Sequence, residues 1–270
     1  MSKSKLVIKS PVEIELIRDG GQALAKIMGV LVSVVQPGIT TRSLDSLARD
    51  LIHKVGGEPA FLHYRPAGAR SPFPAALCVS VNDEVVHGIP GDRILESGDL
   101  VGLDLGLKYQ GLYTDMAVTV AVGEVSAEAL ALLDVTRKAL SAGIAVAKAG
   151  ATTGDIGFAI ATAIPDRLRL IGGQEKYGIV TEFGGHGVGH HVHEPPEIPN
   201  VGLPGSGERL IAGLVIAIEP MIIIGSGKVV TVNDGWTVKT KEGGLSAHFE
   251  HTVLVTDGEP EILTPLEVNL

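Results

Sequence analysis

Four segments of the chain carry apolar residues every three or four positions, which is the spacing of an amphipathic helix. They predict helices near 11–35, 41–55, 126–148 and 154–168. Other segments are nearly continuous runs of β-branched and aliphatic residues, typical of strands that are buried on both faces. They predict strands near 76–81, 99–107, 113–122, 179–183, 213–222 and 248–256. The short polar link at 108–111 predicts a hairpin between the second and third strands.

The chain also repeats itself. Segment 34–52 (VVQPGITTRSLDSLARDLI) resembles 146–164 (VAKAGATTGDIGFAIATAI), because each has a glycine, two threonines and then a helical pattern. The threonines are suitable helix N-caps.

Two further pairs of segments follow in the same order. In 91–106 and in 207–221 a glycine precedes an acid by six residues, and in 113–123 and in 249–258 an acid precedes a glycine by eight residues. Duplication explains these collinear pairs better than chance does. We therefore predict one α+β domain over 1–270, with pseudo-repeats at about 11–123 and 126–258. Their strands would share a central sheet, with helices on one face.

Composition narrows the class of protein. The 270 residues are 45% hydrophobic and 20% charged, and the net charge is −9 with no basic stripe, which argues against a nucleic-acid partner. Apolar runs such as 210–218 are too short for a membrane span of ~20 residues, and the first residues lack an apolar signal core. Cys78 is the single cysteine, which suits a reducing compartment. We expect a cytoplasmic protein, and the absence of a long heptad pattern favours a monomer.

Four acids lie inside the predicted apolar strands, in runs that contain no Lys or Arg: Asp104, Asp115, Glu219 and Glu250. A buried carboxylate that has no partner is costly. Either each acid is satisfied separately, by backbone amides or by distant bases, or the four form one cluster. Two divalent cations would balance the charge of such a cluster, and we favour the cluster.

Histidines lie close to these acids in the sequence. His186 stands between glycines in FGGHGVGHHVHEPP, at the end of an apolar strand, and His87 in VVHGIP has a similar setting. For His190 and His191 we favour an exposed location without a ligand. A site of many oxygens and one nitrogen suits Mn, Fe(II), Co or Zn.

The series CVSVNDEVVHGIP, LDLG…YTDM, GGHGVG…HEPP, AIEPM and SAHFEHTVLVT resembles methionine aminopeptidase of type I, in its bacterial form, over about residues 11–257. This family belongs to the M24 metallopeptidases. The resemblance implies the duplicated "pita-bread" (creatinase/aminopeptidase) fold, with an antiparallel sheet and pseudo-twofold symmetry. It also implies dinuclear-metal hydrolysis that removes the initiator methionine from nascent proteins and peptides when the second residue is small. Contact with the ribosome is an expectation at the level of the family.

The resemblance also implies roles for individual residues. The two divalent metals would be bound by Asp104, Asp115, His186, Glu219 and Glu250. Catalytic roles would belong to His87, His193 and Glu219, and both of these histidines would touch the substrate. The methionine pocket would be lined by Tyr64, Phe73, Cys78 and Trp236, although plain core packing is an alternative for Phe73 and Trp236. A monovalent cation would lie near Asn82 and Ser246.

Two departures from the family pattern concern the substrate pocket. The loop between Tyr64 and Phe73 is lengthened, and Val192 stands where bacterial enzymes often have Phe. Two other functions stay open at this point. One is a peptidase of the same fold that cleaves X-Pro bonds, and the other is a binding protein of this fold that has lost its metals.

Overall fold

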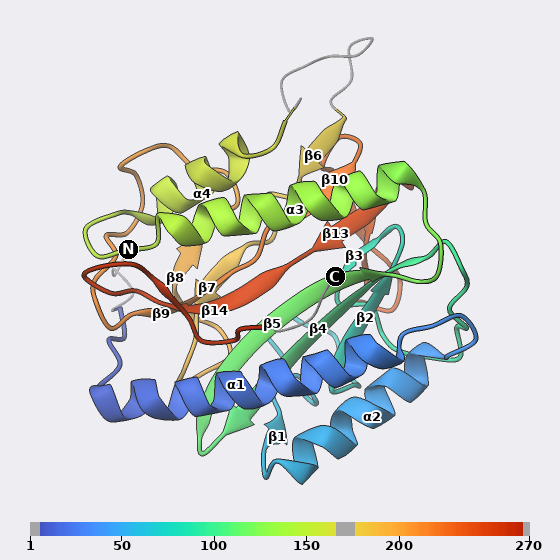
Figure 1. The fold of residues 1–270 in the computed structure, drawn as a ribbon, viewed down its shortest axis with the longest axis horizontal. Helices are drawn as coiled ribbons and strands as arrows, with labels where there is room; N and C mark the ends of the chain where they lie inside the picture. The colour runs from blue at the N-terminus through green and yellow to red at the C-terminus, as the bar shows by residue number, and fades with distance from the viewer. Residues whose placement is uncertain (1–5, 166–175, 267–270) are drawn as a thin grey trace.

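Four helices and a large antiparallel sheet form the framework of the computed structural model, which describes residues 6–165 and 176–266 (Figure 1). The helices are α1 (Pro11–Val34), α2 (Thr41–Lys54), α3 (Ala127–Ala145) and α4 (Thr153–Thr162). All four helix predictions are confirmed, and the predicted end of the last one, at 166–168, lies outside the described residues. None of the helices in the described ranges is long and apolar enough to cross a membrane.

Each helix begins directly after a Ser or Thr whose side chain caps it. The capping oxygens of Ser10, Thr40, Ser126 and Thr152 accept hydrogen bonds from backbone N–H groups in the first turn. These groups have no partner within the helix, so the caps fix where each helix starts. The predicted role of the repeated threonines is therefore confirmed.

Within the described ranges the central sheet has nine strands, in the order β1-β4-β5-β14-β9-β7-β8, with β2 added beside β4 and β15 beside β14. Its strands are β1 (Glu58–Pro59), β2 (Leu77–Val81), β4 (Leu100–Tyr109), β5 (Leu112–Ala121), β7 (Gly185–Gly187), β8 (Glu194–Ile198), β9 (Val215–Ile218), β14 (Glu250–Leu254) and β15 (Glu261–Ile262). The predicted hairpin is confirmed, because Tyr109 pairs with Leu112 and both intervening residues have positive φ.

Two small sheets of three strands complete the fold. One has the order β13-β10-β6 and the other β11-β12-β3. Their strands are β3 (Glu84–Val86), β6 (Tyr177–Ile179), β10 (Met221–Ile224), β11 (Val229–Thr231), β12 (Val238–Thr240) and β13 (Ser246–His248). Several of these strands have three residues, which is too short for a clear period of two. The sequence did not predict β3, β11 or β12, and in the central sheet it did not predict β1, β7, β8 or β15.

Three strand predictions were wrong in their extent. The segment 213–222 is two strands, β9 and β10, because Pro220 has no N–H to continue the ladder. The segment 248–256 is likewise split at Phe249, between β13 and β14, so both segments pass from a small sheet to the central sheet. The strand expected at 179–183 is β6 at Tyr177–Ile179, and after it only Val180 donates a backbone hydrogen bond, to Met221 O.

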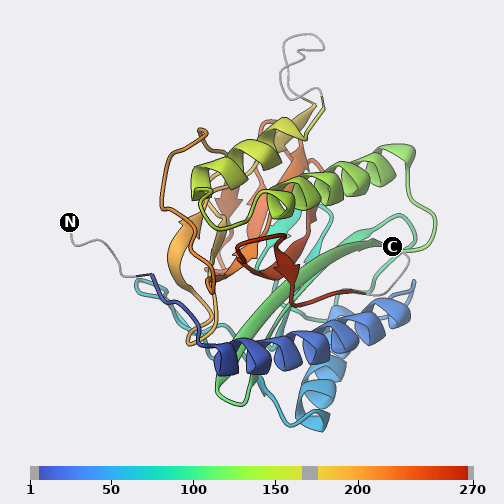
Figure 2. The same ribbon diagram turned by 60° about the vertical axis from the view of Figure 1, so that its left-hand side comes forward.

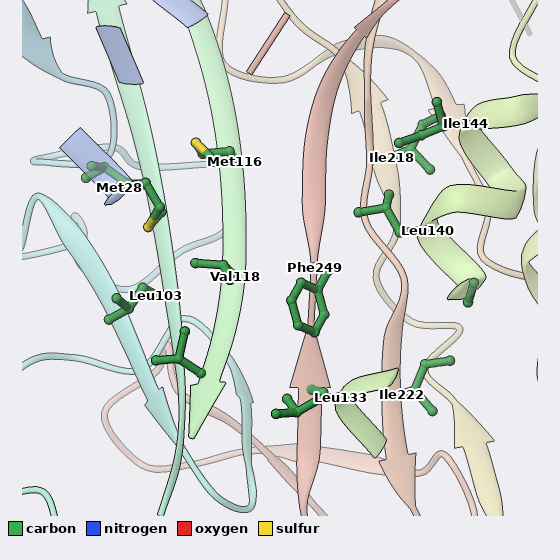
Figure 3. Packing of buried hydrophobic residues seen from close by; sticks show 14 of the residues in the cluster. Met28, Leu103, Met116, Val118, Leu133, Leu140, Ile144, Ile218, Ile222 and Phe249 are labelled. Atoms are coloured by element: carbon green, nitrogen blue, oxygen red, sulfur yellow. The ribbon is translucent and has the colours of Figure 1, made fainter. Parts of the chain in front are cut away.

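The two faces of the central sheet have different surroundings. The helix pairs α1–α2 and α3–α4 run along one face, as Figures 1 and 2 show. On this face Met116 and Val118 of β5 belong to one apolar core with Met28 of α1 and Leu140 of α3 (Figure 3). Successive strand residues point to opposite faces, so the odd-numbered residues of β5, including Asp115, point away from the helices.

One contact recurs in both halves of the chain. Thr40 before α2 forms a β-bridge with Ile94, and Thr152 before α4 forms one with Arg209. In each half the same kind of bridge therefore ties the start of the second helix to the turn that precedes an acid-bearing strand.

Candidate active site

Strand register brings the acids together on the face away from the helices. Ala117 of β5 lies opposite Asp104 on one side and opposite Glu250 on the other. Residues directly opposite one another in an antiparallel sheet project to the same face, so these three form one row. Asp115 is two residues from Ala117 and shares that face.

Two threonine hydroxyls join β5 to β14 where their backbone ladder stops. The ladder pairs Glu250 with Ala117 and His251 with Met116. One residue further, Thr252 Oγ1 donates to Asp115 O at 2.7 Å and accepts from Asp115 N at 2.9 Å. The Thr252 hydroxyl thus stands in for direct backbone pairing and holds the backbone of Asp115.

Thr119 has the matching function at the other end of this ladder. Its Oγ1 donates to His248 O and accepts from His248 N, both at 2.9 Å. The two strands are therefore fixed relative to each other on both sides of the acid row.

A histidine from a third strand completes the cluster. Ligand atoms of Asp115, His186 and Glu250 all lie within 4.8 Å of one another, and all three residues are buried. Glu219 lies in the break between β9 and β10, and its Oε1 is 3.4 Å from His186 Nε2. The structure therefore brings Asp115, His186, Glu219 and Glu250, four of the five predicted ligands, close together, and it places Asp104 in the same cross-strand row as Glu250.

The chemistry of this cluster fits divalent cations. Asp104, Asp115 and Glu250 each keep one buried carboxylate oxygen that has no hydrogen-bond partner among the described residues. Burial, with the charges of neighbouring carboxylates, raises the pKa of Asp104 to about 7 and raises the pKa of Asp115 and of Glu250 well above the ordinary range. A cation that binds these oxygens would remove both penalties.

The orientation of His186 also suits a metal ligand. His186 is predicted at the end of an apolar strand. In the structure it is instead the middle residue of the short strand β7, Gly185–Gly187. The ring Nδ1 lies 2.9 Å from Gly187 O, which leaves Nε2 facing the carboxylates. A backbone carbonyl that holds the second ring nitrogen is the usual way in which a ligating histidine is oriented.

His193 and His87 border the cluster. The His193 ring is 4.3 Å from the His186 ring, centroid to centroid, and its Nδ1 is 2.7 Å from the Tyr64 hydroxyl. The His87 ring contacts Phe183 and Trp236 edge to face. Desolvation of the His193 ring and the neighbouring His186 and His87 lower the pKa of His193 to about 3, although the residue as a whole is exposed. Burial lowers the pKa of His87 to about 4, so both rings are neutral at neutral pH.

The predicted pocket residues gather into one apolar group beside these histidines. Phe73 and Trp236 meet edge to face at 5.2 Å between ring centroids. Cys78 lies opposite Asp104 in the β2–β4 pairing, and burial raises the pKa of its thiol, which keeps it protonated. The group contains Phe61, Phe73, Ala75, Cys78 and Val192, with Tyr64, Ile89 and Trp236 packed against it.

The two residues near the expected monovalent cation, Asn82 and Ser246, differ in whether their side chains are already hydrogen-bonded. Both polar atoms of the Asn82 side chain are hydrogen-bonded, because its Oδ1 accepts from Leu100 N and its Nδ2 donates to Asp99. Ser246 Oγ is buried and has no hydrogen-bond partner among the described residues. Of these two side chains, only that of Ser246 has an oxygen without a hydrogen-bond partner among the described residues.

One site residue had not been predicted. His248 is buried, and its Nε2 lies 3.5 Å from Glu219 Oε2. The signal was present in SAHFEHTV, where His248 is two positions from Glu250 and so shares its face.

His190 and His191 are both exposed, as favoured, and His190 Nε2 is 2.6 Å from Glu13 Oε1.

Comparison with known proteins first gives the broad family to which the chain belongs. The profile of metallopeptidase family M24 matches residues 15–257, a span that includes the whole cluster. The fold is shared more widely: the prolidase from Pyrococcus furiosus superposes with a TM-score of 0.70 at 23% identity, and the match covers 97% of this chain and 66% of that one.

More similar relatives narrow the class. Methionine aminopeptidase of Treponema pallidum is 43% identical over 263 residues, which is 97% of each chain. That of Aquifex aeolicus is 45% identical over 259 residues, which is 94% of this chain and 96% of its own. The crystal structure of methionine aminopeptidase from Rickettsia prowazekii has a TM-score of 0.89 at 35% identity and matches 97% of this chain and 100% of its own. The chain belongs to the methionine aminopeptidases of metallopeptidase family M24.

Proposed function

We propose that this chain removes the N-terminal methionine from peptides and nascent proteins whose second residue is small, by metal-dependent hydrolysis of the first peptide bond. The observation that carries the proposal is the buried cluster of Asp115, His186 and Glu250, which adjoins an apolar group that includes a protonated thiol. The family relationship supports the same activity.

The metal ligands would be Asp104, Asp115, His186, Glu219 and Glu250. When bound, divalent cations would lower the pKa of a water molecule and polarise the peptide carbonyl. Oxygen-rich ligands with one imidazole suit Mn, Fe(II), Co or Zn, and we propose two such ions. The buried hydroxyl of Ser246 supports a monovalent cation nearby, with the backbone rather than the side chain of Asn82 as its second contact.

Glu219 is suited to proton transfer. Its side chain is 12% exposed, whereas Glu250 is 2% exposed, so Glu219 is the more accessible of the two carboxylates. It would accept a proton from the attacking water and deliver it to the leaving nitrogen, which is general acid–base catalysis.

The two neutral histidines would act as hydrogen-bond partners of the substrate. If the Tyr64 hydroxyl donates to His193 Nδ1, the ring proton is on Nε2, which can then donate to the developing oxyanion. His87, from the end of β3, would contact the peptide nitrogen beyond the cleaved bond.

The pocket would hold the methionine side chain. A thioether packs well against aromatic rings such as Phe73 and Trp236. A slot of this kind separates similar side chains weakly, because one methylene is worth ~1–3 kcal/mol. Val192 is a small wall residue and would widen the slot, so selectivity for Met over Leu should lie within ~10–200-fold.

Metal analysis combined with peptide cleavage tests the proposal. The purified protein should hold divalent metal, lose activity on prolonged chelation, and cut Met-Ala-Ser faster than Leu-Ala-Ser, Met-Lys-Ser and Ala-Pro peptides. Faster cleavage of Ala-Ala-Ser than of Met-Ala-Ser would refute the methionine assignment. Full activity in metal-free protein would refute metal dependence. Location in the cytoplasm, a monomeric state and ribosome contact stay predictions from the sequence.

A further inference from the structure

A buried ion pair connects the start of the chain to the loop that carries His193. Lys9 Nζ lies 2.6 Å from Glu194 Oε2, and the two side chains are only 1% and 2% exposed. Taking two charges out of water costs free energy that their attraction often does not return. Stability alone is therefore a poor reason for this pair, and its geometric consequences matter more.

The Glu194 carboxylate holds the backbone on both sides of His193. Its second oxygen, Oε1, accepts from His191 N at 2.8 Å. Glu194 itself follows His193 directly and pairs with Gly187 in the β7–β8 ladder. The chain at 191–194 is thus closed into a tight loop, with His193 inside it.

Lys9 is itself firmly held in place. Its backbone N donates to Gly213 O at 2.9 Å, in the turn before β9. A Cβ atom at Gly189 would overlap Lys9 Cε, so the absence of a side chain there makes room for the lysine. In Figures 1 and 2 the blue segment that leads into α1 accordingly runs beside the orange segments around β8 and β9.

We infer that Lys9 and Glu194 are positioning residues for His193. The ion pair fixes the 191–194 loop, and the loop places the His193 ring against His186 and its Nδ1 on the Tyr64 hydroxyl. The inference rests on the proposed function of His193 and adds residues that touch neither substrate nor metal.

A double-mutant cycle on the full-length, metal-loaded protein tests this inference. Lys9→Met, His193→Ala and the double variant are compared in kcat and KM for Met-Ala-Ser, with metal content measured for each. Lys9→Met should lower kcat by up to ~10²-fold, the size of effect expected from a displacement of about 1 Å. Its KM and metal content should stay unchanged. In the His193→Ala background the same substitution should change kcat by less than about threefold, because both act through one group.

A second ion pair, which is made by Arg18 of α1, serves as the control. Arg18 Nε lies 2.6 Å from Glu261 Oε1, and its other ion-pair partner is Glu15, so neither partner belongs to the 191–194 loop and Arg18→Met should leave kcat unchanged. If Lys9→Met does not fold, Lys9→Met with Glu194→Gln replaces it in the cycle, since that variant buries no unpaired charge.

The outcomes separate the two claims. A wild-type protein that does not cleave Met-Ala-Ser contradicts the proposed function. An active wild-type protein in which Lys9→Met lowers kcat equally in both backgrounds, or not at all, overturns the positioning role alone.

Discussion

Replacing Thr252 by Val tests whether a single hydroxyl holds the two halves of the site together. Valine has nearly the shape of threonine, so packing is kept and only the hydroxyl is lost. Thr252 is fully buried, and its hydroxyl makes two hydrogen bonds to the backbone of Asp115. Thr252→Val leaves the N–H and C=O of Asp115 without these partners.

The magnitude follows from those two groups. Each buried polar group left unpaired costs about 1–3 kcal/mol, so Thr252→Val should lower the free energy of unfolding by about 2–6 kcal/mol. Movement of the Asp115 backbone would also displace a predicted metal ligand. We therefore expect weaker metal binding as well as lower stability.

Urea unfolding of the chelated protein, followed by circular dichroism, measures the stability, and metal titration of the folded protein measures the affinity. Thr114→Val is the matched control, because Thr114 is equally buried and its Oγ1 has no hydrogen-bond partner within the described parts of the chain. It should be as stable as wild type or more stable. Thr252→Ser keeps the hydroxyl and should keep the metal affinity. If Thr252→Val unfolds at the same urea concentration as Thr114→Val, the reasoning is wrong.

Three further predictions concern the same site. Glu219→Gln should lower kcat by roughly 10²–10⁴, the range for loss of a general base, and near-normal turnover in steady-state assays would remove Glu219 from proton transfer. Tyr64→Phe removes the hydroxyl bonded to His193 and should lower kcat about 2–10-fold, the value of one hydrogen bond, with unchanged metal content; equal kcat for both proteins would contradict it. Chelated protein should lose stability as pH rises from about 4 to about 7, because the raised pKa of Asp104 means that the folded state keeps a proton that the unfolded state releases. The slope should approach about 1.4 kcal/mol per pH unit for each such carboxyl; unfolding curves between pH 5 and 8 that show stability rising with pH would contradict this sign.

The sequence alone was sufficient for features that depend on neighbouring residues. The helices follow from a period of three to four and from caps such as Thr40 and Thr152, both of which are local properties. The acids Asp104, Asp115 and Glu250 were recognisable because a carboxylate inside an apolar strand needs a partner wherever that strand lies. The family motifs then connected these acids to one kind of metal centre.

Only the tertiary structure decided how distant segments meet. Pro220 is a local signal for one split, but the passage of both segments from a small sheet to the central sheet depends on which strand lies beside each of them. Apolar runs look the same whether they stay in one sheet or pass between two. Glu219 therefore lies in a break and not inside a strand. Lys9 meets Glu194 across 185 positions of sequence, and no local pattern encodes such a pairing. Register is set by the packing of whole strands, and that packing determines which hydroxyl holds Asp115 and which lysine holds the loop of His193.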